Sequence, residues 1–176
     1  MRRKLHFGCG RHEITGWENF DHEVDISKPL PFADECASHI YTQHVVEHIA
    51  APDAWRFFQE CYRVLDKNGV IRVAVPSITR ANTAIMQGGA DAVEYLKFGK
   101  EHGFHDGTQR GALEAIATKH GHQSLWTYEL LEVALGAIGF TTTREGVFCS
   151  MRLEMRELER HGVFREFDTI VVEGVK

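Results

Sequence analysis

Short apolar stretches and amphipathic stretches alternate along this chain, and the alternation predicts its secondary structure. Lys4–Phe7 and Trp17–Asp21 have the length and composition of β-strands, Val24–Ile26 would form a short third strand, and His39–Gln43 a fourth. Strands that alternate with helices are typical of an α/β domain, in which helices pack on a mainly parallel sheet.

The clearest helix is expected at Pro52–Leu65. Its apolar residues recur at three- and four-residue spacing and therefore share one face, and a proline fits the first helical turn. Asn68 can adopt a positive φ and would end this helical segment. Val70–Val75 is then expected as a buried strand, which Pro76 stops.

The region from Ser77 to about Gln123 has the least regular pattern. Two helices are expected within it, at about Ala90–Lys100 and Gly111–Lys119. Four of the chain's eleven histidines also lie in this region. The pattern predicts helical structure here without fixing how the segments pack.

The pattern becomes regular again toward the end of the chain. Thr127 is a good N-cap for a helix at Tyr128–Ile138, which Gly139 would close. The remaining segments are expected to be a strand at Phe140–Phe148, a charged and solvated helix at Ser150–His161, and a final strand at Phe167–Val175.

The composition narrows the class of protein. The chain has 176 residues, 43% of them hydrophobic, which suits one domain with a substantial core. Its net charge of −5 disfavours nonspecific binding to nucleic acid. Neither a signal peptide nor an apolar run long enough to span a bilayer is recognisable. The four cysteines lack the spacing of a metal site or a disulfide framework, so we expect free thiols in a cytoplasmic protein. Because no apolar run is long enough, no membrane contact is expected.

The first chemical feature is an apolar strand that stops at Gly8-Cys9-Gly10. A Gly-x-Gly loop lets a ligand approach bare backbone, and a carboxylate at the end of the next strand, Asp21, can accept two hydrogen bonds from a ribose diol. The two features indicate a nucleoside-containing ligand, whereas a plain turn explains the loop alone equally well. Glu13 occupies the place of the third glycine of a dinucleotide-binding loop, and the chain has no P-loop sequence.

Several short sequences, taken in chain order, resemble class I S-adenosylmethionine-dependent methyltransferases, in particular the small methyltransferase-domain-11 branch. Leu5–Gly10 resembles the glycine-rich first motif of that family, and Gly16–Asp21 resembles its second-strand motif. The other matching segments are Asp25 with Pro29–Phe32, His44–Ile49, Tyr62–Gly69, His120–His122 and Ala137–Phe140.

The resemblance implies a Rossmann-like fold with a mostly parallel seven-stranded sheet, an antiparallel C-terminal strand and helices on both faces. One domain would span residues 1–176, with a cofactor-binding half at 1–76, an acceptor-side insertion at 77–126, and a helix and strand hairpin at 127–176. The implied reaction is methyl transfer from S-adenosylmethionine to an unidentified, small-molecule acceptor, with S-adenosylhomocysteine as product. Nucleic acid is not the expected partner, and the chain would be a monomer or homodimer.

The resemblance also assigns cofactor-binding residues. Gly8 and Gly10 would let the methionine portion of the cofactor approach the backbone, and Asp21 would hold the ribose hydroxyls. Asp25 would accept from the adenine amine, although a cap on the following turn explains it equally well. The expected set is Phe7, Gly8, Cys9, Gly10, Asp21, Asp25, Ile26, Leu30, Gln43 and His44.

Histidines dominate the expected acceptor side. His44 would end the fourth strand near the transferable methyl group, because ligands of open α/β sheets gather at the carboxyl ends of strands; a structural role is the alternative. His120 and His122 could accept protons near neutral pH and complete the candidate catalytic set. The candidate acceptor-binding residues are His48, His105 and Trp126, with core packing the alternative for the tryptophan.

Two other functions stay open at this point. His6 replaces an acid common in the family and the helices after the first two strands are shortened, which favours a degenerate member that binds cofactor or a partner without catalysis. His120 and His122 with a further histidine could hold zinc. However, no cysteine lies near them and no zinc-site spacing occurs, so no metal is expected.

Overall fold

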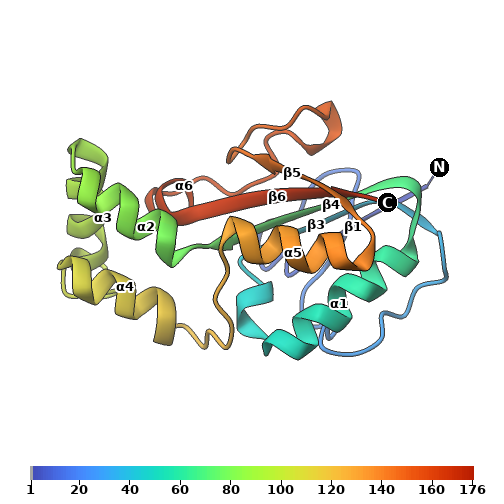
Figure 1. Ribbon diagram of the computed structural model, residues 1–176, viewed down its shortest axis with the longest axis horizontal. Helices are drawn as coiled ribbons and strands as arrows, with labels where there is room; N and C mark the ends of the chain where they lie inside the picture. Colours follow the sequence, from blue (N-terminus) through green and yellow to red (C-terminus); the bar gives the residue numbers. More distant parts are fainter. Residues whose placement is uncertain (1) are drawn as a thin grey trace.

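The computed structural model describes residues 2–176, in which six strands form one mixed sheet (Figure 1). The spatial order is β2-β1-β3-β4-β6-β5; β1 to β4 run parallel, and β6 runs antiparallel to both of its neighbours. This confirms the expected fold class and the antiparallel last strand. The strands are β1 (Arg3–Phe7), β2 (Glu18–Phe20), β3 (Ala37–Gln43), β4 (Leu65–Pro76), β5 (Thr141–Glu145) and β6 (Thr169–Val175).

The described sheet has six strands and not the expected seven, because Val24–Ile26 does not form a strand. Val24 and Ile26 are both buried, so the apolar residues of this segment do pack in the core as the pattern indicated. The Asp25 side chain, however, accepts hydrogen bonds from Ser27 N (2.9 Å) and Oγ (2.6 Å), and Lys28 N donates to the Asp25 carbonyl. A backbone that turns this tightly cannot extend alongside β2.

The expected helices at residues 52–65, 90–100, 111–119 and 128–138 are confirmed, with shifts of a few residues at their ends. An additional helix, α2, follows Pro76, and its N-cap Ser77 accepts a hydrogen bond from Arg80 N. Only Ala81 of α2 is buried, which explains why periodicity did not reveal it. The helices are α1 (Ala51–Val64), α2 (Ile78–Gln87), α3 (Ala90–Glu101), α4 (Gln109–Thr118), α5 (Tyr128–Ile138) and α6 (Val163–Asp168), with 3₁₀ turns η1 (Val46–His48) and η2 (Leu153–Met155).

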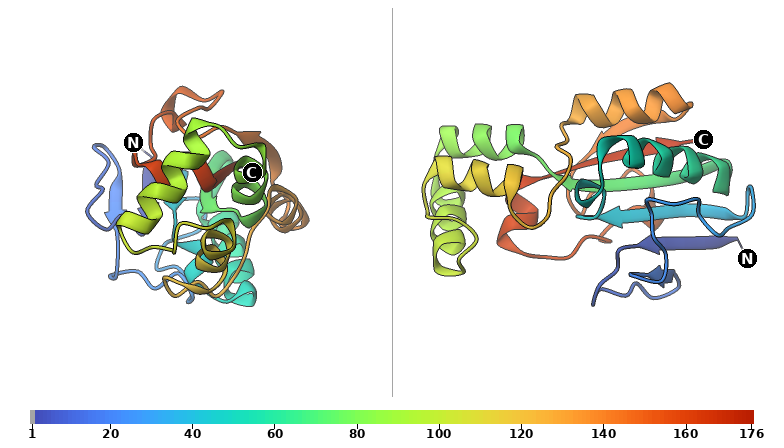
Figure 2. Two further views of the ribbon diagram at one scale, coloured as in Figure 1. Left: turned by 90° about the vertical axis from the view of Figure 1, so that its left-hand side faces the viewer. Right: turned by 90° about the horizontal axis from the view of Figure 1, so that it is seen from below.

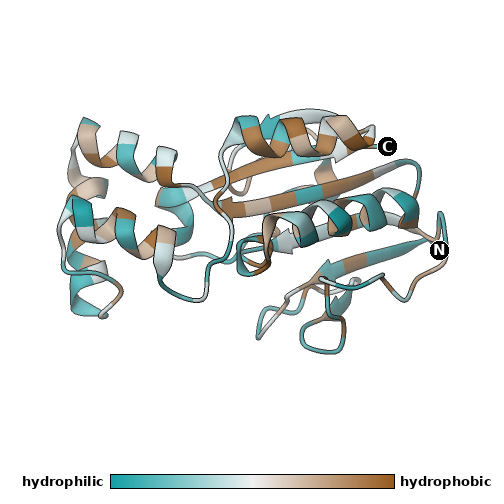
Figure 3. Ribbon diagram, turned by 60° about the horizontal axis from the view of Figure 1, so that its bottom comes forward, coloured by the Kyte–Doolittle hydropathy of each residue, from teal (hydrophilic) through white to brown (hydrophobic). Residues whose placement is uncertain are grey.

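Helices α1 and α5 lie side by side on one face of the sheet (Figures 1 and 2). Alternate strand residues point toward these helices and form the main core, among them Phe7, Ile40, Val73 and Val172. Figure 3 shows the apolar residues concentrated along the central strands and α5. This face has the purely apolar packing expected for a sheet covered by helices.

The opposite face carries irregular segments instead of the expected helices. Residues of the 146–162 segment, including Met155 and Leu158, pack against Tyr41 on β3. The helix expected at Ser150–His161 was wrong apart from the single turn η2. Most charged residues of this segment are exposed, but Glu159 is buried, and its carboxylate accepts from Arg72 Nε (2.6 Å).

Helices α2, α3 and α4 extend beyond the carboxyl ends of the parallel strands, next to α6 (Figures 1 and 2). They follow β4 directly and occupy most of the segment expected to lie on the acceptor side. The four cysteines are free thiols, as expected. Within residues 2–176, no helix combines the length and the apolar character that crossing a membrane requires.

Candidate active site

Three cavities at the carboxyl ends of the parallel strands share one lining residue, His44. The strand-end cavity, of about 500 Å³, lies over β1 and β2 and includes Gly8 and Asp21. The loop cavity, of about 150 Å³, lies beside the Gly8–Gly10 loop. The helix-side cavity, of about 270 Å³, lies between η1 and the helical extension. Ligands of open α/β sheets bind at this edge, so the three cavities form the candidate site.

Of the two glycines in the loop after β1, only Gly8 lies where an added side chain would clash with a neighbour. Gly8 has φ +71°, and a Cβ built on it would lie 2.1 Å from Val45 Cγ2. The amides of Gly8 and Cys9 donate to the Phe20 carbonyl (2.7 and 3.0 Å), which holds the loop against the end of β2. Gly10, at φ +51°, meets no atom within 4 Å and faces open space.

Two carboxylates line the strand-end cavity, and they differ in their hydrogen bonding within the protein. Asp21 follows β2 directly, and its carboxylate lies 3.4 Å from His22 Nε2, which is fully exposed. Asp25 uses Oδ1 to cap the Ser27 turn, and the hydrogen bonds from Ser27 lower the pKa of Asp25. The turn-cap alternative for Asp25 is therefore present in the structure, whereas Asp21 remains available to a ligand.

His44 occupies a strained position at the end of β3. Its φ of +54° is left-handed, and its amide donates to the Ala74 carbonyl (2.9 Å). Its Nε2 lies 2.7 Å from Thr169 Oγ1. Burial, with a smaller effect of the Arg165 charge, lowers the pKa of His44 to about 3. The imidazole is therefore neutral at physiological pH, and it can orient a ligand better than it can hold a proton.

The helix-side cavity contains two buried carboxyl groups. Glu47 is 1% exposed, neither of its carboxyl oxygens has a hydrogen-bond partner, and burial raises its pKa to about 8. Burial raises the pKa of Asp168 to about 7, while its Oδ2 accepts from Tyr95 OH (3.0 Å). Arg165 also lines the cavity, and burial lowers its pKa. This concentration of perturbed groups is typical of functional sites.

Comparisons with known proteins agree with this geometry. Residues 19–73 match the family model described as a methyltransferase domain. A S-adenosylmethionine-dependent methyltransferase from Archaeoglobus fulgidus has a similar structure, with a TM-score of 0.63 and 15% identity over 99% of this chain and 86% of that one. The fold is that of a class I S-adenosylmethionine-dependent methyltransferase.

Two further methyltransferase structures resemble the chain. One, from Mesorhizobium loti, has a TM-score of 0.53 and 13% identity over 99% of this chain and 90% of that one. The other is described as a possible histamine N-methyltransferase from Thermotoga maritima, with a TM-score of 0.52 and 16% identity over 100% and 83% of the two chains. No protein with a curated description matches the sequence.

The structure brings most of the expected cofactor residues of this methyltransferase fold together. The side chains of Phe7 and Leu30 are exceptions, since they pack in the core and line neither cavity. The expected residues that line the strand-end or loop cavity are Gly8, Cys9, Gly10, Asp21, Asp25, Ile26, Gln43 and His44. Their role in cofactor binding remains a prediction.

The expected acceptor-side histidines also gather in one place. His48, His105, His120 and His122 line the helix-side cavity with His44, and the rings of His48 and His122 lie 4.9 Å apart. Trp126 does not belong to this cavity. Its ring packs in the core against Phe58 and its Nε1 donates to Ser124 Oγ (3.0 Å), so its placement as an acceptor-binding residue was wrong.

Sequence reasoning missed the groups that come from the start of β6. Thr169 pairs with Pro76 in the antiparallel β4–β6 register, so the beginning of β6 lies at the same edge as the carboxyl ends of the parallel strands. Asp168 and Arg165 thereby enter the helix-side cavity. The expectation of an antiparallel last strand could have revealed these groups. A strand that runs antiparallel to the others begins at the edge of the sheet where the parallel strands end.

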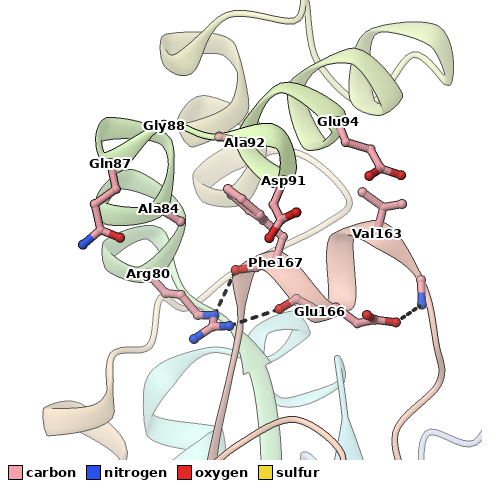
Figure 4. A pocket seen from close by; sticks show the side chains of 11 residues that line it. Arg80, Ala84, Gln87, Gly88, Asp91, Ala92, Glu94, Val163, Glu166 and Phe167 are labelled. Carbon is pink, nitrogen blue, oxygen red and sulfur yellow. Dashed lines mark hydrogen bonds between the residues drawn. The ribbon is translucent and has the colours of Figure 1, made fainter.

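Another cavity, of about 600 Å³, is a different feature (Figure 4). It lies between α2, α3 and α6, away from the strand ends. Two of its polar groups are engaged by the fold, since Arg80 donates to the Phe167 and Glu166 carbonyls and the Glu166 carboxylate accepts from Gly162 N.

Proposed function

We propose that this chain transfers a methyl group from S-adenosylmethionine to a small-molecule acceptor. The cofactor would occupy the strand-end and loop cavities, and the acceptor would occupy the helix-side cavity. The observation that carries this proposal is that His44 lines all three cavities. A methyl group beside His44 would face an acceptor while the rest of the cofactor lies along the strand ends.

The cofactor side offers two kinds of contact. Gly8 and Gly10 carry no side chains where the methionine portion would pass, which allows close approach to the backbone. Asp21 presents a carboxylate that could accept both ribose hydroxyls. Asp25 keeps only one oxygen free of its turn, so we assign it a minor role beside Asp21.

The bound cofactor supplies an electrophilic methyl group on a sulfonium, and the protein's task is alignment and removal of water. His44 is fixed by Thr169 and the Ala74 carbonyl, so it can form a rigid wall at the point of transfer. Asp168 titrates near neutral pH and is the group of this cavity whose pKa best suits acceptance of a proton from the acceptor.

The acceptor cavity favours a small molecule. Its volume of about 270 Å³ is slightly below the range of drug-sized ligand pockets, roughly 300–1,000 Å³, so it suits a small acceptor. Apolar walls from Phe104 and Ile116 face the polar groups described above. The net charge of −5 also disfavours a nucleic-acid acceptor.

Calorimetric titration with S-adenosylmethionine and S-adenosylhomocysteine tests the proposal. Wild-type protein should bind both with micromolar affinity, and Asp21→Ala should weaken binding at least about tenfold, or 1.4 kcal/mol. His122→Ala is the matched control, because His122 lines only the helix-side cavity and its removal should leave cofactor affinity unchanged. Absence of binding would overturn the methyltransferase proposal and favour a degenerate scaffold protein.

A further inference from the structure

Glu47, His48 and His122 converge in the helix-side cavity. One potential ligand atom from each lies within 4.8 Å of the other two, and no other group of this kind occurs in residues 2–176. The first two residues come from η1, and His122 comes from the segment after α4. The chain therefore joins two distant segments at this point.

The state of Glu47 is the observation that most needs an explanation. Its side chain is almost completely buried, yet neither oxygen has a hydrogen-bond partner in the structure. An unpartnered buried carboxylate is costly, so such groups are normally paired with a cation or a donor. His48 Nε2 lies 3.9 Å from Glu47 Oε1, a distance that leaves the carboxylate without a direct hydrogen bond.

The imidazole of His122 is oriented as a metal ligand usually is. His122 Nδ1 lies 2.6 Å from the Ile116 carbonyl, so Nδ1 carries the proton and Nε2 keeps its lone pair for the cavity. His48 points its Nε2 toward the Glu47 carboxylate. A hydrogen bond from the far ring nitrogen to a carbonyl fixes the tautomer and orientation of metal-binding histidines in the same way.

We propose that Glu47, His48 and His122 bind one divalent transition-metal cation. Three atoms that lie within 4.8 Å of one another always have a common point no farther than about 2.8 Å from any of them. Metal bonds to imidazole nitrogen and carboxylate oxygen are about 2.0–2.2 Å, so each ligand atom needs to move inward by no more than about 0.8 Å. Two imidazoles select a transition metal over Mg²⁺ or Ca²⁺, and the fourth position opens to the cavity.

Cation binding at this cluster is independent of methyl transfer, because it can be measured without S-adenosylmethionine. Zn²⁺ is the probe for calorimetry and for metal analysis after dialysis of chelator-treated protein. Co²⁺ provides an optical readout, since ligand-field absorption reports its coordination. Wild type should retain about one equivalent of Zn²⁺ and show Co²⁺ absorption bands.

Removal of any ligand should weaken Zn²⁺ binding at least about 10–100-fold, the loss seen even when a supporting second-shell group is removed. Glu47→Gln preserves side-chain shape, and His122→Ala changes a half-buried residue that the fold tolerates more easily. His102→Ala is the control, because His102 is exposed at the end of α3 and outside the cluster. Circular dichroism and thermal unfolding of each variant confirm folding.

Two results would overturn the inference. One is wild-type protein that retains no Zn²⁺ after dialysis. The other is Zn²⁺ affinity that is the same in His122→Ala, Glu47→Gln and His102→Ala, since the metal would then bind elsewhere on the chain. If Glu47→Gln fails to fold, the comparison of His122→Ala with His102→Ala decides the question alone.

Discussion

The strand-end cavity and the helix-side cavity meet at His44, yet the chain builds them in different ways. The strand-end cavity comes mainly from residues 8–26, through backbone turns and a single free carboxylate. The helix-side cavity collects side chains from η1, α3, α4 and the α6–β6 junction, which are far apart in sequence. The first depends on local backbone geometry, and the second depends on how the whole fold packs.

The difference has a chemical counterpart. The two carboxylates of the strand-end cavity, Asp21 and Asp25, reach solvent, whereas burial raises the pKa of Glu47 and Asp168 in the helix-side cavity. A solvated cavity suits the binding of a charged nucleoside, and a buried one suits chemistry that excludes water. Mutations in the two regions should therefore fail in different ways.

The largest effect is expected at Gly8. A side chain there would overlap Val45 and also adopt an unfavourable φ of +71°, so Gly8→Ala should lower the free energy of unfolding by about 2–5 kcal/mol. Gly10→Ala meets open space and should cost only about 1–2 kcal/mol from its positive φ. Urea denaturation measures both, and equal losses would show that contact with Val45 does not set the loop.

The next effect concerns Asp168. Its pKa is raised from 3.8 to about 7, so the folded state binds the proton more tightly than the unfolded chain does, and stability falls as pH rises through that range. Asp168→Asn should match wild type near pH 4 and be more stable at pH 8 by up to about 4 kcal/mol.

Urea denaturation at the two pH values measures this difference. Asp91→Asn, which changes an exposed aspartate of α3, is the control and should follow wild type at both values. A variant that is less stable than wild type at pH 8 would show that the Asp168 carboxylate is stabilised by charge partners and not penalised by burial.

The smallest effect is expected at His44, where two substitutions distinguish the cost of its backbone conformation from the contribution of its imidazole. Asparagine tolerates the left-handed region better than alanine does, so His44→Asn should be about 0.5–1 kcal/mol more stable than His44→Ala. Both variants lose the contact with Thr169, which cancels in the comparison. Equal stability in thermal unfolding would show that the positive φ at His44 relaxes at no cost.

The sequence predicted the fold where a pattern decides it locally. Strands, the amphipathic helix α1 and the capped helix α5 were recognisable because their residues repeat with the period of the element. The prediction failed at Ser150–His161, where a charged pattern favoured a solvated helix. The buried pair of Glu159 with Arg72 determines that segment's path, and a contact between residues so far apart leaves no periodic signal.

The same contrast between local features and long-range contacts applies to the candidate site. Gly8, Gly10 and Asp21 could be placed from short motifs, because backbone turns and strand ends are local features. Glu47 and Asp168 could not, because their importance comes from burial and from the antiparallel β6 that carries one of them to the strand ends.

A crystal structure of the complex with S-adenosylhomocysteine tests the central claim most directly, because that claim is a placement. We expect the ribose hydroxyls within about 2.6–3.2 Å of the Asp21 carboxylate, the homocysteine portion along Gly8–Gly10, and the sulfur beside His44, facing the helix-side cavity. A ligand bound away from Asp21, or a sulfur turned away from His44, would contradict the account.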